Sequence, residues 1–252
     1  MRRSNPSDRD GGTTVAGRKK TFHGVTVGIL MVKTGFCRLP GDVGHAGTWD
    51  FPVQYRIVEG ATPDKMMALE SSGLLDDFKA AARDLVAGGV DGIATTCGFL
   101  ALYQRELAAA CGVPVASSSL LQVPLAQRLI APDKRVGILT FSKESLHASH
   151  LEAVGVDAGT PVEGMPADSV FVTAIKSGDV VPRHEAMRVE VLQAAERLLD
   201  RHPDVGAIVS ECANMTPFSA DIAERFSIPV FDGVSLINWF QAGLRPRRYP
   251  AA

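Results

Sequence analysis

The chain has 252 residues, and its 46% of hydrophobic and 21% of charged residues are typical of a globular protein of one large or two small domains. The formal net charge of −2 argues against nucleic acid as a partner, because binding phosphate groups requires a basic surface. No apolar run reaches the roughly 18 residues of a membrane span, so no membrane partner is expected either.

Residues 1–21 are basic and polar, and they contain no apolar stretch long enough for a secretory signal. We therefore predict a disordered tail over residues 1–21 and a cytoplasmic location. In the reducing cytosol the cysteines are expected to stay free thiols. Their spacing shows neither a Cys-x-x-Cys pair nor a Cys/His cluster, so no metal site is expected.

Apolar runs follow one another along the chain, and most of them are continuous and rich in valine and isoleucine, which predicts strands buried on both faces. In chain order the predicted strands are Thr26–Val32, Val53–Glu59, Gly92–Cys97, Val113–Ser117, Arg135–Phe141, Ala207–Cys212 and Pro229–Asp232. Amphipathic segments between them predict helices, among them Leu74–Ala87, Ala101–Ala110, Lys143–Val154 and His184–His202. This alternation predicts an α/β fold with mainly parallel sheets.

The chain also resembles itself at a fixed offset. When the sequence is shifted by 115 residues, Val90–Gln122 aligns with Val205–Ile237 without a gap, and Cys97 meets Cys212. Two copies in a chain of this length predict two similar α/β/α lobes related by a pseudo-twofold axis, with the active site in the cleft between them. We expect lobe 1 to comprise residues 22–118 and 236–252, and lobe 2 to comprise residues 119–235.

Each of the two paired cysteines ends a predicted strand and precedes a predicted turn or helix. Ligands of open α/β sheets bind beyond the carboxyl ends of the strands, so Cys97 and Cys212 are expected to flank one cleft. The nearby backbone N–H groups and helix dipole are expected to lower the thiol pKa values. Opposed thiols suit a reaction in which one removes a proton from carbon and the other returns one. For Cys111, at the end of a helix pattern, ordinary packing as a small apolar residue is expected.

These features resemble the aspartate/glutamate racemase superfamily: two α/β lobes, a cysteine after a matching strand in each, and a first strand of Val-Gly-Ile-Leu. The resemblance covers about Thr26–Phe240. It implies an enzyme that needs neither pyridoxal phosphate nor a metal, with Cys97 and Cys212 as its catalytic pair. It further implies that Thr96, Gly98 and Asn214 lie in the adjoining substrate-binding turns.

The two cysteine motifs depart from the usual pattern of amino-acid racemases in this superfamily. Those enzymes usually carry Cys-Asn-Thr in the first lobe and Gly-Cys-Thr in the second. Here the first motif reads Cys97-Gly98-Phe99 and the second begins Glu211-Cys212-Ala213. Aspartate or glutamate is therefore not the expected substrate, and Phe99 would make the pocket more apolar.

Further binding residues are expected around the cleft. Arg38, in the glycine-rich loop Thr34–Phe51, would clamp a substrate carboxylate with two hydrogen bonds. Backbone amides at Gly98–Phe99 and Ala213–Asn214 would stabilise negative charge on the substrate, and Thr216 would assist.

Four other residues are weaker candidates with less specific interpretations. Ser118 either binds ligand or caps the following helix. Glu211 tunes the neighbouring thiol, binds a substrate amine, or simply reaches water. Cys37 is expected to be a bystander, and His184 would matter in a Cys–His hydrolase.

The expected function is that of a cofactor-independent racemase or epimerase of an amino acid or related small carboxylate, by two-cysteine proton transfer at Cα. A decarboxylase of the arylmalonate type or a cis-trans isomerase of the maleate type is the first alternative. A non-catalytic small-molecule binding protein is the second. A homodimer is the expected assembly, because dimers are the commonest oligomers.

Overall fold

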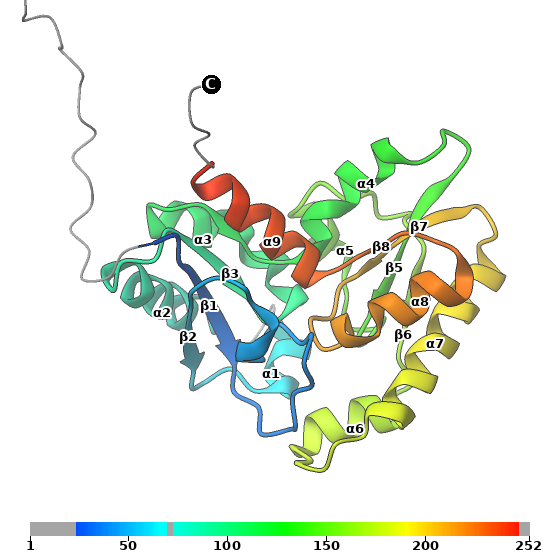
Figure 1. Cartoon of the computed structure of the whole chain (residues 1–252), viewed down its shortest axis with the longest axis horizontal. Coiled ribbons are helices and arrows are strands. Elements are labelled where there is room, and N and C mark those ends of the chain that lie inside the picture. The colour runs from blue at the N-terminus through cyan, green and yellow to red at the C-terminus, as the bar shows by residue number, and fades with distance from the viewer. Residues whose placement is uncertain (1–23, 70–72, 247–252) are drawn as a thin grey trace, which may run out of the picture.

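The computed structural model describes residues 24–69 and 73–246, so the predicted tail over residues 1–21 lies outside the described residues. Two four-stranded parallel sheets form the framework (Figure 1). The first has the order β2-β1-β3-β4, with β1 at Val27–Val32, β2 at Val53–Val58, β3 at Gly92–Thr95 and β4 at Val115–Ala116. The second has the order β6-β5-β7-β8, with β5 at Arg135–Thr140, β6 at Val162–Gly164, β7 at Val205–Ser210 and β8 at Val230–Phe231.

The strand registers confirm the duplication. Ile93 of β3 pairs with Val115 of β4, and Ile208 of β7 pairs with Val230 of β8, which are the same positions 115 residues later. Parallel strands of this kind are buried on both faces, which explains the continuous apolar runs in the sequence. The predicted fold of two similar α/β lobes with parallel sheets is therefore confirmed.

Helices flank both sheets. They are α1 at Pro63–Met67, α2 at Leu75–Ala87, α3 at Gln104–Cys111, α4 at Val123–Leu129, α5 at Ala148–Glu152, α6 at Val170–Ser177, α7 at His184–Arg201, α8 at Ser219–Phe226 and α9 at Gly233–Leu244. Helices α2 and α3 contact the first sheet, whereas α7 and α8 contact the second. The last helix, α9, returns to the first sheet and contacts β3 and β4 (Figure 1). The expected lobe limits, including residues 236–252, stay a prediction.

Strand β6 and helix α5 differ from the sequence-based expectation. Strand β6 was not predicted, because it is only three residues long and its central residue, Glu163, is a buried acid that Arg197 and Arg201 neutralise. The helix predicted over Lys143–Val154 shrinks to α5. Its first part is a turn in which Ser142 Oγ accepts a hydrogen bond from Ser145 N, at 3.2 Å, in competition with helical backbone bonding.

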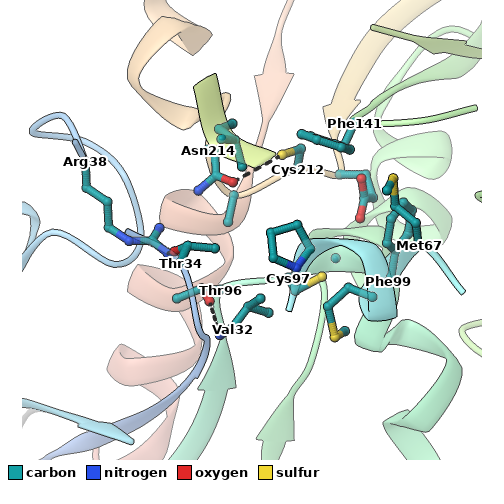
Figure 2. A pocket seen from close by; sticks show the side chains of 16 residues that line it. Val32, Thr34, Arg38, Met67, Thr96, Cys97, Phe99, Phe141, Cys212 and Asn214 are labelled. Carbon is teal, nitrogen blue, oxygen red and sulfur yellow. Dashed lines mark hydrogen bonds between the residues drawn. The ribbon is translucent and has the colours of Figure 1, made fainter. Parts of the chain in front are cut away.

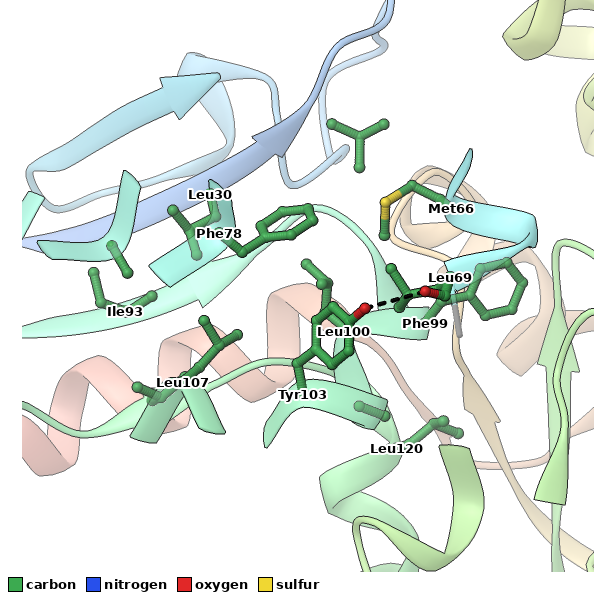
Figure 3. Packing of buried hydrophobic residues seen from close by; sticks show 14 of the residues in the cluster. Leu30, Met66, Leu69, Phe78, Ile93, Phe99, Leu100, Tyr103, Leu107 and Leu120 are labelled. Carbon is green, nitrogen blue, oxygen red and sulfur yellow. Dashed lines mark hydrogen bonds between the residues drawn. The ribbon is translucent and has the colours of Figure 1, made fainter. Parts of the chain in front are cut away.

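The largest apolar cluster joins the two sheets. It includes Leu30, Phe78, Ile93 and Leu107 of the first lobe, whose packing is drawn in Figure 3. The same cluster continues into Val136, Ile138, Ala207 and Val209 of the second sheet. The lobes therefore share buried apolar surface, which is the main favourable term in folding. No helix within residues 24–69 and 73–246 combines the length and the apolar character that crossing a membrane requires.

Candidate active site

A pocket lies where the central strands of the two sheets end. Val32 ends β1, Phe141 follows β5, and the two cysteine turns follow β3 and β7. The pocket has a volume of about 490 Å³, counting the part open to solvent. It is lined by Val32, Thr34, Arg38, Pro63, Met66, Met67, Thr96, Cys97, Gly98, Phe99, Phe141, Ile175, Glu211, Cys212, Ala213 and Asn214. Figure 2 shows both cysteines on this pocket.

Cys97 is positioned by the end of β3. It caps the 3-10 helix η3 (Gly98–Tyr103), and its carbonyl accepts a hydrogen bond from Leu100 N at 3.1 Å. Its own N–H donates to Thr95 Oγ1 at 3.3 Å, and that hydroxyl donates to Ser117 O at 2.5 Å on the neighbouring strand end. These bonds hold the Cys97 turn to the sheet and turn the half-buried thiol to the pocket.

Cys212 occupies the equivalent place after β7. Its thiol is buried and lies 3.8 Å from Asn214 Oδ1, to which it donates. Asn214 Nδ2 in turn donates to Asp42 Oδ2 at 2.8 Å, so the turn of lobe 2 is tied to a loop of lobe 1. The hydrogen bond to Asp42 fixes the orientation of the Asn214 side chain, and therefore also the Oδ1 atom that faces the thiol.

Both thiols strongly favour the neutral form. Burial and, after it, the nearby Glu211 carboxylate raise the pKa of Cys97 to about 12, against hydrogen bonds from the backbone of Phe99 and Leu100 that lower it. The same two causes, burial and Glu211, raise the pKa of Cys212 well above its ordinary value. The expectation that the turns would lower the thiol pKa values is therefore wrong, because desolvation outweighs the backbone N–H groups.

Glu211 lies against both cysteine turns. Its side chain is 3% exposed, its Oε2 accepts a hydrogen bond from Thr140 Oγ1 at 2.8 Å, and burial raises its pKa to about 7. A Cβ atom on Gly98 would collide with the Glu211 carboxylate and backbone carbonyl, so only glycine fits there. The interpretation of Glu211 as a strand-end residue that reaches water is wrong, because the side chain is buried beside the two thiols.

Arg38 forms a polar wall of the pocket. Its guanidinium donates to Asp42 Oδ1 at 2.7 Å and to Thr34 Oγ1 at 2.9 Å, and it lies 4.7 Å from the centre of the Phe36 ring. Asp42 is 1% exposed and also accepts from Gly44 N, at 2.7 Å. The pair holds Arg38 at the pocket, and the expected binding of a substrate carboxylate by Arg38 stays a prediction.

The structure brings most of the expected binding residues together. Thr96, Gly98, Phe99, Ala213 and Asn214 line the pocket with the two cysteines. Thr96 also uses its hydroxyl to accept a hydrogen bond from Val32 N, at 3.2 Å. These positions agree with the sequence-based expectation, and their roles stay predictions.

Two expected residues lie beside the pocket rather than on it. Ser118 lines a smaller neighbouring cavity, and its hydroxyl caps the 3-10 helix η4 (Ser119–Gln122) by accepting from Leu120 N at 3.2 Å. The Thr216 hydroxyl donates to Gly41 O and to Ala213 O, which ties the loop of lobe 1 to the Cys212 turn. Both hydroxyls are thus engaged in holding backbone.

No sequence motif points to several of the residues that line the pocket. Pro63, Met66 and Met67 come from α1, and Ile175 comes from α6, two helices that are distant from the cysteine motifs along the chain. Phe141 is the exception. It directly follows the end of β5, in the place that Val32 has at the end of β1 in the other lobe. The duplication therefore offered a signal for Phe141.

The remaining candidate residues lie away from the pocket. Cys37 donates its backbone N–H to Asp179 O, Cys111 is buried in α3, and the His184 ring packs on Phe218 with 5.3 Å between centroids. Among the described residues that line the pocket there is no histidine. Within the described part of the chain no group of three or more His, Cys, Asp and Glu side chains is arranged to hold a metal ion.

No family model matches the chain. The chain is 27% identical to a dimethylsulfoniopropionate lyase of Durusdinium sp. clade D, over 90% of this chain and 77% of that protein. It is 29% identical to dimethylsulfoniopropionate lyase 3 of Emiliania huxleyi, over 87% of this chain and 60% of that protein. The chain thus spans less than two thirds of the Emiliania protein.

Solved structures share the fold. Allantoin racemase from Klebsiella pneumoniae aligns with a TM-score of 0.58 and 16% identity, over 88% of this chain and 87% of that one. Arylmalonate decarboxylase aligns with a TM-score of 0.55 and 16% identity, over 88% and 96%. Glutamate racemase from Francisella tularensis aligns with a TM-score of 0.53 and 14% identity, over 90% and 85%. The chain therefore has the same two-lobed α/β fold as these solved proteins.

Proposed function

We propose that this chain is a cofactor-independent lyase that removes a proton next to a carboxylate and eliminates a sulfide from a sulfonium carboxylate such as dimethylsulfoniopropionate. The observation that carries the proposal is the pair of thiols on one pocket, in a chain that resembles dimethylsulfoniopropionate lyases along 87–90% of its length. The pocket has an arginine for the carboxylate and an apolar wall for the methyl groups.

The reaction follows from the groups on the pocket. The thiolate of Cys97 or Cys212 takes the proton from the carbon next to the carboxylate. The electron pair of that C–H bond becomes the new C=C bond, and the C–S bond breaks with its electrons leaving on sulfur. The sulfonium thus departs as neutral dimethyl sulfide, and acrylate remains. Arg38 and the backbone amides of the two cysteine turns would hold the carboxylate, whose negative charge grows in the transition state.

Racemisation or epimerisation of a small carboxylate is the second candidate. The equivalent positions of Cys97 and Cys212 after β3 and β7 favour it, because two opposed thiols can take and return a proton on opposite faces of one carbon. A decarboxylase of the arylmalonate type and a cis-trans isomerase of the maleate type use related chemistry on the same fold. A non-catalytic binding protein would keep the pocket and show none of these reactions.

The test is a measurement of acrylate and dimethyl sulfide released from dimethylsulfoniopropionate, with parallel proton NMR in D2O on a panel of chiral amino acids and carboxylates. Removing a catalytic proton-transfer group should slow the reaction about 100-fold or more, so at least one of Cys97→Ser and Cys212→Ser should lose activity and thereby identify the base. Cys37→Ser is the matched control, because this partly exposed thiol does not line the pocket, and it should keep the wild-type rate.

The outcomes separate the candidates. Acrylate release that survives both pocket substitutions would contradict the proposed thiol chemistry. Exchange of a Cα proton for deuterium in a chiral acid, without acrylate release, would favour the racemase. Binding of small carboxylates without either reaction would favour the binding protein.

A further inference from the structure

The pocket has two ends of unlike chemistry. Arg38, Thr34, Thr96 and Asn214 make one end polar, with the arginine as the cation among the described lining residues. Figure 2 shows Arg38 and Thr34 on one side of the cysteines, and Phe99, Met67 and Phe141 on the other. A ligand that spans the pocket would therefore meet a cation at one end and aromatic and thioether groups at the other.

Above its pKa of about 7, Glu211 supplies negative charge at the apolar end. Its backbone follows β7 beside Cys212, its carboxylate accepts hydrogen bonds from Thr140 and from the backbone of Phe141, and it presses against Gly98, next to Phe99. In the described part of the chain no ion pair joins Glu211 to a lysine or arginine. A buried carboxylate without a basic partner is costly, because the charge loses its hydration. A ligand cation would relieve that cost.

We propose that Glu211, Phe99 and Phe141 form a subsite for the onium group of a zwitterionic carboxylate, whose carboxylate end is held by Arg38. This inference rests on the proposed function for the choice of sulfonium among onium groups. An onium ion carries methyl groups and no N–H, so it needs apolar walls, aromatic rings and a diffuse negative charge rather than many hydrogen-bond acceptors. Aromatic faces attract such cations, and the thioethers of Met66 and Met67 are polarisable and adapt to methyl groups.

The subsite also accounts for how a buried thiol becomes a base. In the empty pocket burial and the Glu211 charge hold both thiols in the neutral form. A bound onium group offsets the Glu211 charge and attracts a thiolate directly, so it lowers the cost of ionising Cys97 or Cys212. The base is then formed chiefly when a cationic substrate occupies the pocket. A primary ammonium would gain less, because its three N–H donors require more acceptors than this end of the pocket supplies.

The experiment compares three ligands by isothermal titration calorimetry on the full chain. They are β-alanine betaine, β-alanine, and an isostere of the betaine in which an uncharged tert-butyl group replaces the trimethylammonium group. This third ligand is called the neutral isostere after its uncharged end. All three share the carboxylate, so their differences report on the other end of the pocket. In the wild type the betaine should bind about tenfold more tightly than the neutral isostere, the size expected for a desolvated cation–π and charge contact. It should also bind more tightly than β-alanine.

The key variant is Glu211→Gln, which keeps the shape of the side chain and removes its charge. The preference for the betaine over the neutral isostere should fall to about threefold or less, while the affinity for the isostere stays within a factor of about three, which shows that the pocket is intact. Phe141→Leu should reduce the same preference, since it removes an aromatic face. Glu106→Gln, an exposed change on α3, is the matched control and should keep the wild-type preference.

Failure of the subsite and failure of the proposed function give different results. A wild-type preference near one, or a preference that Glu211→Gln leaves unchanged, would overturn the subsite even if the wild type releases acrylate from dimethylsulfoniopropionate. A preference that collapses in Glu211→Gln would support the subsite even if no acrylate is released, and the lyase proposal alone would then fail.

Discussion

Gly98 and Glu211 make the tightest contact between the two cysteine turns. A Cβ atom at Gly98 would meet both the carboxylate and the backbone carbonyl of Glu211, and the carbonyl has no rotamer by which to move away. We therefore expect Gly98→Ala to lower the free energy of unfolding by about 1–3 kcal/mol, the usual cost of overpacking. It should also lower activity, because the two thiols would be pushed apart. Urea denaturation and the acrylate assay measure the two effects.

A glycine elsewhere provides the control for that prediction. Gly243 lies near the end of α9 with open space around the position of its Cβ atom. Because alanine favours a helix over glycine by up to about 1 kcal/mol, Gly243→Ala should leave stability unchanged or raise it. Equal effects of the two substitutions would contradict the close contact at Gly98.

The pKa of Glu211 makes stability depend on pH. Burial raises this pKa from its ordinary 4.5 to about 7, so the folded protein keeps the proton at pH values where the unfolded chain has lost it. The free energy of unfolding contributed by this group should therefore fall as the pH rises from about 4.5 to about 7, by about 3 kcal/mol in total, and then level off. The neighbouring Cys97 and Cys212 thiols stay neutral throughout this range because their pKa values are raised.

Glu211→Gln removes that titration and gives the measurement. The free energy of unfolding is measured by urea denaturation at several pH values. The difference between the variant and the wild type should grow in favour of the variant across this pH range and stay constant above it. Parallel curves for the two proteins would mean that Glu211 titrates as it does in the unfolded chain.

The sequence alone predicts that the two cysteines occupy equivalent positions, but it does not predict how deeply they are buried. Cys97 and Cys212 align at the shift of 115 residues, and the structure places both on one pocket. The direction of their pKa shifts was mispredicted, because the local pattern shows the backbone N–H groups but not the burial that outweighs them. Met67 and Ile175 could not be found, since they reach the pocket from helices that are distant along the chain and carry no motif.

Among the larger elements, the loop between β1 and β2 joins the two lobes at the pocket. Asp42 of this loop accepts hydrogen bonds from Arg38 and from Asn214 of the other lobe, and it is 1% exposed. In Asp42→Asn an amide nitrogen would replace one of the two acceptor oxygens and face one of these donors, and the guanidinium would lose its counter-charge. We expect a loss of about 3–5 kcal/mol in the free energy of unfolding, as for other buried pairs that lose one partner.

An exposed pair of the same chemistry is the control for the Asp42 prediction. Arg56 and Asp84 lie 2.7 Å apart, with side chains 55% and 61% exposed. Exposed ion pairs contribute about 1 kcal/mol or less, so Asp84→Asn should change the urea midpoint only slightly. A similarly small change in Asp42→Asn would show that the loop does not depend on this carboxylate.

Sequence patterns found the elements that are apolar and repeated. All seven predicted strands are present. Most of them, such as β1, β5 and β7, are continuous apolar runs because these parallel strands are buried on both faces. The first-lobe helix expected over Ala101–Ala110 is present but begins as the 3-10 helix η3, because Cys97 and Gly98 start the turn at the pocket. The loop Thr34–Phe51 has no periodicity, and its fold depends on the contacts of Asp42 across the lobes, which no local pattern contains.

At the scale of the whole molecule, the shared core predicts that the lobes unfold together. The main apolar cluster runs from Leu30 and Phe78 through Val136 and Ile138, so each sheet buries part of its apolar surface in a core that both lobes share. A cavity in lobe 2 should therefore lower the stability of lobe 1 as well. Leu198 of α7 is fully buried against the second sheet, and Leu198→Ala should cost about 2–5 kcal/mol.

Trp49 makes that coupling measurable, because it is buried in the loop of the first lobe. In a Trp239→Phe background, which leaves Trp49 as the fluorescent probe, Leu198→Ala should shift the urea midpoint seen by Trp49 as far as the midpoint seen by far-UV circular dichroism. Leu107→Ala, in α3 of the first lobe, is the control. It should shift both midpoints whether the lobes unfold together or separately, and so shows that Trp49 reports a loss of stability in its own lobe. If Leu198→Ala moved the circular dichroism midpoint and left that of Trp49 in place, the lobes would be independent folding units. The pocket would then lie at a hinge between two domains rather than inside one cooperative structure.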